Sequence, residues 1–559
     1  MITVELNVAN FEYDIHSLVK AFYPEHEVLV RAVCAEDPEQ ESLRLRYPEV
    51  SFHLSVFYGR SDITFSFYNG QETEADLQDS VSADFSDRKT TKNRLKQKLY
   101  ELLAVLSGRT LPWGTLTGIR PTRIPYTMLE EGVSETEIRT YMRETYLASN
   151  EKIDLSLEIA KRERWLLSRV DYENGYSLYI GIPFCPSTCL YCSFTSYPIY
   201  TWKKRVDDYL DALCREISWT ADACRNRYLN SVYIGGGTPT SLEPEQLERL
   251  IMHIGESFHL MDAEGRILYG GTDRVNERSG RDHSTAEVFS CSNEAAEPER
   301  DRAGKPYDIC GQEDSISNHL LEFTVEAGRP DSITAEKLAV LKRHNISRIS
   351  INPQTMKEET LRLIGRQHTV EQTRQSFSLA REMGFDNINM DLIVGLPEES
   401  LDDVRCTMEA ISKLCPDNVT VHSLAIKRAS RLRTERENYG HLHIKNTWET
   451  IRLTADYCRQ MGLEPYYLYR QKNMAGNFEN VGYAAPGKAG VYNILIMEEK
   501  QSIMALGAGA TTKVVYDRGN RIERVGNVKD ITNYLERVDE MIERKRKLLN
   551  KIGKIQNEI

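Results

Sequence analysis

Cysteine is scarce in this chain, with 11 residues in 559. That density is too low for a scaffold held together by disulfides, and it fits a reducing, cytoplasmic location. Long apolar runs are also missing: no stretch of about eighteen apolar residues occurs, so no membrane span is expected. The first residues, Met-Ile-Thr-Val-Glu, lack the basic and then apolar pattern of a signal peptide.

Basic charge is in deficit as well. Lys and Arg number 71 against 83 Asp and Glu, which gives a formal net charge of −12. Proteins that bind nucleic acids usually present a basic surface. The balance therefore argues against a nucleic-acid partner, and it makes an enzyme that acts on tRNA the least favoured function.

Three of the few cysteines are concentrated in one short segment. Cys185, Cys189 and Cys192 follow a strand-like stretch with the spacing C-x3-C-x2-C. Three thiolates can hold three irons of a [4Fe–4S] cube and leave the fourth iron open for chemistry. Structural zinc usually needs four nitrogen or sulfur ligands, and no fourth Cys or His lies within this segment.

A glycine-rich turn strengthens the case for a cluster. Gly235, Gly236 and Gly237 are followed by Thr238 and end the next apolar strand. Without side chains, the backbone of such a turn can approach a ligand closely. Together, the cysteines and the turn favour a cluster that binds and cleaves S-adenosylmethionine over a zinc site or unrelated buried thiols.

Strand-like and helix-like segments alternate in the middle of the chain. The expected strands are Tyr176–Ile182, Ser231–Ile234, Glu322–Glu326, Ser347–Ile351, Asn387–Val394 and Asn418–Leu424. Alternating strands and helices predict a parallel sheet with crossover helices. Six such units favour a partial (β/α)6 barrel over a closed eight-stranded one, so the fold class is α/β.

The predicted domains follow from this pattern. Residues 1–165 are expected to form an N-terminal α+β domain, in which the turn-rich segment 111–123 is a surface loop or a docking strap. Residues 170–435 are expected to form the core barrel, and 436–559 a mostly helical domain that covers the substrate. Within the barrel, residues 265–318 are polar, charged and aperiodic, which is typical of a disordered insert.

The polar residues at the strand ends form the second group of candidates. In α/β barrels, the chemistry lies at the carboxyl ends of the strands. The third strand delivers Glu326, a carboxylate suited to a ribose diol or an ammonium group. The next three strands deliver Asn352 with Gln354, then Asp391, then His422. A helix cap would explain Asp391 and a buried core position would explain His422, but their joint arrival at one barrel end favours a function.

These motifs resemble the radical S-adenosylmethionine superfamily and, more narrowly, the oxygen-independent coproporphyrinogen III oxidase family in its HemZ-type branch. The resemblance runs from about residue 176 to 552 apart from the insert, and it includes Pro-Trp-Gly-Thr-Leu-Thr-Gly-Ile-Arg-Pro near the N-terminus. It implies a [4Fe–4S] cluster on the three cysteines and a tyrosine near the cluster at Tyr179. It also implies S-adenosylmethionine contacts at Gly235, Gly236, Gly237, Thr238, Glu326, Gln354, Arg366 and Asp391.

The resemblance further implies a reaction and its partners. The expected enzyme decarboxylates propionates of coproporphyrinogen III to vinyls in haem biosynthesis and receives electrons from flavodoxin or ferredoxin. The alternative is a haem-carrying protein that keeps the cluster. Phe194 stands where many decarboxylating members have a further cysteine, and Tyr492-Asn493 stands where the haem-carrying branch has His-Asn. Arg431 and Arg470 are expected to hold the propionates, because arginine grips carboxylates through paired hydrogen bonds.

Overall fold

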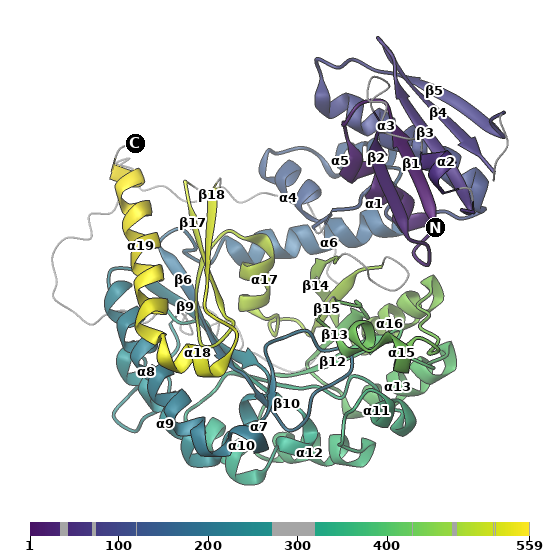
Figure 1. Cartoon of the computed structure of the whole chain (residues 1–559). Coiled ribbons are helices and arrows are strands. Elements are labelled where there is room, and N and C mark those ends of the chain that lie inside the picture. The colour runs from purple at the N-terminus through teal and green to yellow at the C-terminus, as the bar shows by residue number, and fades with distance from the viewer. Residues whose placement is uncertain are drawn as a thin grey trace, which may run out of the picture.

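The computed structural model describes residues 1–33, 43–47, 49–69, 74–118, 120–270, 319–427, 429–471, 478–517, 519 and 521–557. It divides into an N-terminal sheet domain, a group of connecting helices and a large barrel-like sheet (Figure 1). None of the helices in these ranges has the length and apolar character that a membrane crossing would require.

The N-terminal domain has its own sheet and core. Its five strands are β1 (Ile2–Leu6), β2 (Val28–Ala32), β3 (Phe52–Tyr58), β4 (Asp62–Tyr68) and β5 (Leu77–Ser82), in the order β2-β1-β3-β4-β5. Helices α1 (Glu12–Phe22) and α3 (Arg88–Ser107) cover one face, and a short α2 (Leu43–Arg46) lies beside β1.

Three helices connect this domain to the barrel: α4 (Arg123–Glu130), α5 (Glu135–Tyr146) and α6 (Asn150–Leu167). They share a hydrophobic core with Tyr466, Ala484 and Leu495 of the C-terminal region. The predicted docking strap is anchored by Trp113, which is 2% exposed and donates its indole hydrogen to Glu479 at 2.8 Å. The docking strap therefore packs on the barrel, while the buried residues of the N-terminal core run from Ile2 to Leu103.

The centre of the barrel is the predicted set of six parallel strands. They are β6 (Gly175–Ile182), β9 (Tyr228–Gly236), β10 (Glu322–Gly328), β11 (Arg348–Ile351), β12 (Ile388–Val394) and β13 (Asn418–Ser423), each paired with the next. The crossover helices are α8 (Val206–Ala223), α9 (Pro244–Ser257), α10 (Ala335–Arg343), α11 (Glu358–Leu363), α12 (Val370–Glu382) and α13 (Leu401–Leu414). The partial barrel is confirmed, since β13 and β6 are not paired to each other in the described sheet.

The C-terminal region extends this sheet at both ends, which the expectation of a mostly helical domain did not foresee. Strands β14 (Glu464–Tyr469) and β15 (Asn480–Ala484) add antiparallel to β13. At the other end β16 (Ser502–Leu506) pairs parallel with β6, followed by antiparallel β17 (Thr511–Tyr516) and β18 (Arg521–Gly526). The helices here are α14 (Arg431–Thr434), α15 (Arg436–Tyr439), α16 (Trp448–Gln460), α17 (Val491–Glu498), α18 (Ile531–Glu536) and α19 (Val538–Asn557).

The segment predicted as an insert begins as packed structure. Ile267 is fully buried, forms a β-bridge with Met261 and donates its backbone hydrogen to His344 O at 3.1 Å. The Tyr269 hydroxyl donates to Asn345 O at 2.8 Å. Residues 265–270 thus belong to the barrel, and the rest of the predicted insert, 271–318, lies outside the described residues.

Candidate active site

The segment that carries Cys185, Cys189 and Cys192, here called the cysteine segment, starts where β6 ends and is held from several sides. A short β7 (Phe184–Cys185) pairs with β8 (Tyr197–Pro198), and a short helix α7 (Ile199–Trp202) follows. Arg329, at the end of β10, donates to the backbone oxygen of Ser187 at 3.0 Å, and the Ser187 hydroxyl donates to Gly365 O at 2.9 Å. The end of β10 and the turn after α11 therefore fix the shape of this segment.

The three thiols on this segment differ in how far they are buried. Cys189 is buried, whereas Cys185 and Cys192 are partly accessible. Desolvation raises the pKa of Cys185 to about 12, against the effect of Thr238, which donates to its sulfur at 3.4 Å. Among the described residues no three His, Cys, Asp or Glu side chains form a group that could hold a metal ion as they stand. The segment supplies the donors for a cluster, but the thiols are not gathered into a ligand set.

The glycine turn fits the role of a ligand cradle, because each glycine faces a different candidate residue. A Cβ atom at Gly235 would lie 3.0 Å from a Glu326 carboxylate oxygen, and one at Gly236 would lie 3.2 Å from the Tyr179 hydroxyl. A Cβ at Gly237 would lie 3.0 Å from Cys185 Sγ. The turn therefore brings the cysteine segment and two predicted site residues into one place, with room only for backbone.

The Glu326 carboxylate is held at the end of β10 by hydrogen bonds. The Tyr233 hydroxyl and the Gly236 backbone N–H donate to it. Desolvation by the surrounding barrel raises the pKa of Glu326 to about 7, and the negative charge of Asp391 adds to this effect. Glu326 therefore changes its charge near neutral pH, which is typical of functional carboxylates.

Asp391 lies on β12 in a different electrostatic setting. Asn389 donates to its Oδ1 at 2.7 Å, and His422 Nε2 lies 3.9 Å from its Oδ2. Burial alone would raise the pKa of Asp391, but hydrogen bonding and the charge of His422 leave it below its usual value. Asp391 is therefore a carboxylate that stays charged beside one that titrates.

Gln354 and Arg366, the other two residues whose side chains are expected to contact S-adenosylmethionine, each donate to a neighbouring backbone oxygen. Gln354 has a left-handed φ of 70°, and its backbone N–H donates to Asp391 O at 3.0 Å. Arg366 donates to Asn352 O and lies beside Cys189 and Tyr191, so its side chain contacts the cysteine segment. Gln354 Oε1 and Arg366 Nε are buried without a hydrogen-bond partner among the described residues. Such orphaned polar atoms are costly unless a ligand satisfies them.

Tyr179 belongs to an aromatic stack that the sequence reasoning missed. It is the register partner of Tyr233 and stacks on it at 6.2 Å, and Tyr233 stacks on Tyr492 at 4.5 Å. The period of two along a strand places Tyr233 on the same face as Gly235, so this residue could have been found. Tyr492 comes from α17, far away in the sequence. The resemblance singled it out at the position of a histidine, but nothing in the sequence placed it against Tyr233.

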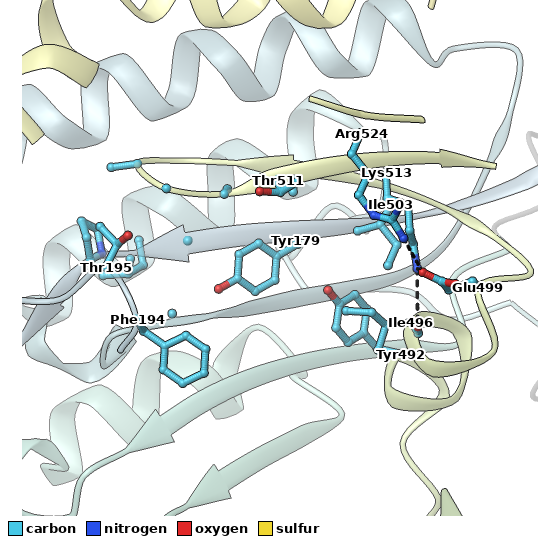
Figure 2. Close-up of a pocket in the computed structure, with 18 residues that line it drawn as sticks. Tyr179, Phe194, Thr195, Tyr492, Ile496, Glu499, Ile503, Thr511, Lys513 and Arg524 are labelled. Atoms are coloured by element: carbon cyan, nitrogen blue, oxygen red, sulfur yellow. Dashed lines mark hydrogen bonds and ion pairs between the residues drawn. The ribbon is translucent and has the colours of Figure 1, made fainter. Parts of the chain in front are cut away.

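A cavity of about 370 Å³ opens beside this stack (Figure 2). One wall is β6 with Tyr179 and Ile182, and the other is the C-terminal strand group β16–β18. Glycine lets these walls approach, because a Cβ at Gly507 would lie 2.5 Å from Gly181 O. Phe194, which is 75% exposed and lies two residues after the last cysteine, closes one end.

The two carboxylates give an expected result for binding of S-adenosylmethionine. In the wild type, affinity should rise as the pH increases through about 7, because Glu326 becomes charged and can then hold hydroxyl or ammonium hydrogens. Glu326→Gln should weaken binding about tenfold and abolish this rise, since a lost charged hydrogen bond costs about 1–3 kcal/mol. Asp391→Asn should weaken binding at both pH 6 and pH 8 and shift the rise to lower pH, because it removes a negative charge that raises the pKa of Glu326.

Anaerobic titrations of cluster-loaded protein at both pH values check this expectation. Iron content serves as the control, because neither substitution should change it. Equal affinities in the wild type and both variants would mean that neither carboxylate contacts the ligand.

Comparison with known proteins identifies the relatives of this chain. Residues 179–411 match the model of the radical SAM superfamily. The chain is 34% identical to the oxygen-independent coproporphyrinogen-III oxidase-like protein HemZ of Bacillus subtilis (strain 168), over 96% of this chain and 95% of that protein. It is 30% identical to the heme chaperone HemW of the same organism, over 63% of this chain and 74% of that protein. A solved structure of coproporphyrinogen III oxidase (HemN) from Escherichia coli covers 68% of this chain and 72% of its own, with 20% identity and a TM-score of 0.45.

The chain belongs to the radical SAM superfamily. Within it, the chain is a member of the family of oxygen-independent coproporphyrinogen-III oxidase-like proteins. The superfamily uses a [4Fe–4S] cluster and S-adenosylmethionine, so the family and cofactor predictions are confirmed.

Proposed function

We propose that this protein is an oxygen-independent coproporphyrinogen III oxidase that converts propionate side chains to vinyls. The observation that carries the proposal is the cavity, which reaches Tyr179 and Phe194 at the cysteine segment and continues between aromatic and aliphatic walls. A ligand pocket of this volume and lining suits a large apolar body. The similarity to HemZ along nearly the whole chain supports the same choice of substrate.

Each propionate loses a hydrogen atom, carbon dioxide and one electron when it becomes a vinyl group, and a one-electron acceptor outside the protein takes up that electron. When bound, the cluster and S-adenosylmethionine supply the one-electron cleavage that removes this hydrogen atom. In the proposed site Cys185, Cys189 and Cys192 hold the cluster, and the glycine turn lets backbone approach the cofactor. Glu326 and Asp391 orient it through its polar groups, and the tyrosine stack excludes water from the reacting centre.

The C-terminal region has the proposed role of covering the substrate. Residues of α17, β16, β17 and β18 make up most of the cavity wall opposite β6. An electron carrier such as flavodoxin or ferredoxin is the proposed reductant. The eight cysteines in the described part of the chain are free thiols, which fits the proposed cytoplasmic setting.

The heme chaperone relative gives a second candidate, a haem-carrying role. The residue that argues against it is Tyr492, which replaces the histidine of that branch. Tyr492 is 4% exposed and stacked on Tyr233, and burial holds its pKa well above the usual value. A neutral, buried phenol is a poor haem ligand, so the oxidase is the better supported of the two functions.

An anaerobic assay separates the two functions. Reduced, cluster-loaded protein is incubated with S-adenosylmethionine and coproporphyrinogen III, and the porphyrin products and 5′-deoxyadenosine are quantified. A parallel titration measures haem binding. Turnover to vinyl products with weak haem binding is the expected result, whereas stoichiometric haem binding without turnover would favour the carrier.

A further inference from the structure

The end of the cavity opposite the cysteine segment is positively charged. Figure 2 shows Phe194 and Thr195 at one end, Lys513 and Arg524 at the other, and Tyr179 between them. Lys513 lies on β17 and Arg524 on the neighbouring β18, where they are register partners. Nothing in the superfamily motifs accounts for two cations at this place.

These cations converge on a single carboxylate, that of Glu499. Arg524 Nη2 lies 2.6 Å from Glu499 Oε1, Lys513 Nζ lies 3.7 Å from the same oxygen, and Arg120 Nη2 lies 2.6 Å from Oε2. In this group, here called the cationic end, Glu499 is shared by three cations. Arg120 also faces the buried Glu163 and Glu498, so the positive charge at the cavity is that of Lys513 and Arg524. The Lys513 side chain is only 9% exposed, and burial lowers its pKa to about 8, so an added anion would relieve the cost of its charge.

A purely structural role would account for part of this arrangement. Arg120 ties the docking strap to α17 through Met497 O at 2.8 Å, and Lys513 donates to Ile496 O at 3.1 Å. Those contacts need no second cation on the cavity wall. Arg524, whose side chain is 52% exposed, is the surplus charge that a ligand can reach.

The residues expected to hold propionates lie elsewhere. Arg431 is occupied by Glu435, with Nε 2.7 Å from Oε1, and Arg470 is 4% exposed and donates to Leu116 O. Neither of them lines the cavity. The sequence placed the clamp beyond β13, whereas the cavity is bounded by β6 and β16–β18.

We propose that Lys513 and Arg524 bind a carboxylate of the substrate and hold its apolar body along Tyr179 and Tyr492, towards the cysteine segment. The ligand class is an amphipathic anion with at least one carboxylate beyond the one that reacts. That this ligand is a tetrapyrrole with four propionates rests on the proposed function. Guanidinium and ammonium groups are suited to this role, because charged hydrogen bonds to carboxylates are among the strongest.

The test removes the two cations and, separately, their counter-charge. The probe is coproporphyrin III, the stable oxidised form with four carboxylates, and its tetramethyl ester serves as the uncharged probe. Binding to cluster-loaded protein is measured by fluorescence titration. Lys513→Met with Arg524→Gln should weaken coproporphyrin III binding about tenfold or more, while binding of the ester should stay unchanged.

Glu499→Gln should have the opposite effect and tighten coproporphyrin III binding, because it removes the only carboxylate that the three cations share. A folding defect would weaken binding in both variants, so the opposite signs exclude it. The matched control is Arg521→Gln with Lys551→Met. It removes the same charge from cations that pair with Asp517 and Glu523 and do not line the cavity.

Three results would overturn the inference: wild-type affinity in the Lys513/Arg524 variant, an equal loss in the control, or a parallel loss for the ester. Failure of the proposed function has a different signature. If the wild type binds coproporphyrin III through these cations but never converts coproporphyrinogen III, the anion site stands and the oxidase does not. If the wild type turns over and the variant keeps its Michaelis constant, the anion site alone is wrong.

Discussion

Alanine at any one of Cys185, Cys189 or Cys192 should leave the protein unable to hold a full cluster after anaerobic reconstitution. The wild type should bind about four irons and four sulfides, held by three thiolates. Removing one ligand of three should also abolish cleavage of S-adenosylmethionine. Iron and sulfide analysis together with 5′-deoxyadenosine release check this expectation.

The control for this experiment is Cys214→Ala. Cys214 is a free thiol on α8, outside the cysteine segment, and is 9% exposed. It should keep full iron content and activity. Full clusters in all three segment variants would show that the thiols are not the ligands.

Gly237→Ala should be the most damaging glycine-to-alanine substitution in the turn. Its Cβ would lie 2.5 Å from Phe184 O, 2.8 Å from Ile182 O and 3.0 Å from Cys185 Sγ. Two of these atoms are backbone, so the turn and the cysteine segment must move apart. Overpacking of this kind costs about 1–3 kcal/mol, and here it also displaces a cluster ligand.

The midpoint temperature of thermal unfolding, the iron content and the affinity for S-adenosylmethionine should all fall in this variant. Gly553→Ala in α19 is the control, because a Cβ there meets no atom within 4 Å. Wild-type cluster content and affinity in Gly237→Ala would contradict the close approach of the turn to the cysteine segment.

The parallel strands could be predicted because their signal is local. Runs of apolar residues gave all six central strands, and the rule that chemistry lies at the carboxyl ends of barrel strands singled out Glu326 and Asp391. The C-terminal strands carry no such signal. β16 pairs with β6, more than three hundred residues earlier, and a sequence does not reveal which distant strand a segment will join.

The residues of the candidate site divide in the same way, into those that a local motif reveals and those that only long-range pairing brings to the site. The cysteines and the glycine turn follow directly from motifs, because spacing within a few residues determines what a segment can bind. Tyr492, Lys513 and Arg524 reach the cavity only through long-range pairing of β16–β18 and the packing of α17. The expectation that Arg431 and Arg470 form a carboxylate clamp assumed that cations next in sequence to a strand end face the substrate, and neither residue lines this cavity.

The limit of the N-terminal domain could not be read from composition either. Lys152 on α6 forms a buried ion pair with Glu479, which also accepts from Trp113. Neither Lys152 nor Glu479 stands out in the sequence, because charged residues usually remain at the surface. The pair fixes the docking strap and α6 to the barrel.

The most direct test of the oxidase assignment follows a hydrogen atom. Coproporphyrinogen III deuterated at the propionate β-carbons is incubated anaerobically with reduced, cluster-loaded protein and S-adenosylmethionine. The account predicts vinyl products together with deuterium in the released 5′-deoxyadenosine. Unlabelled 5′-deoxyadenosine with intact propionates would contradict it.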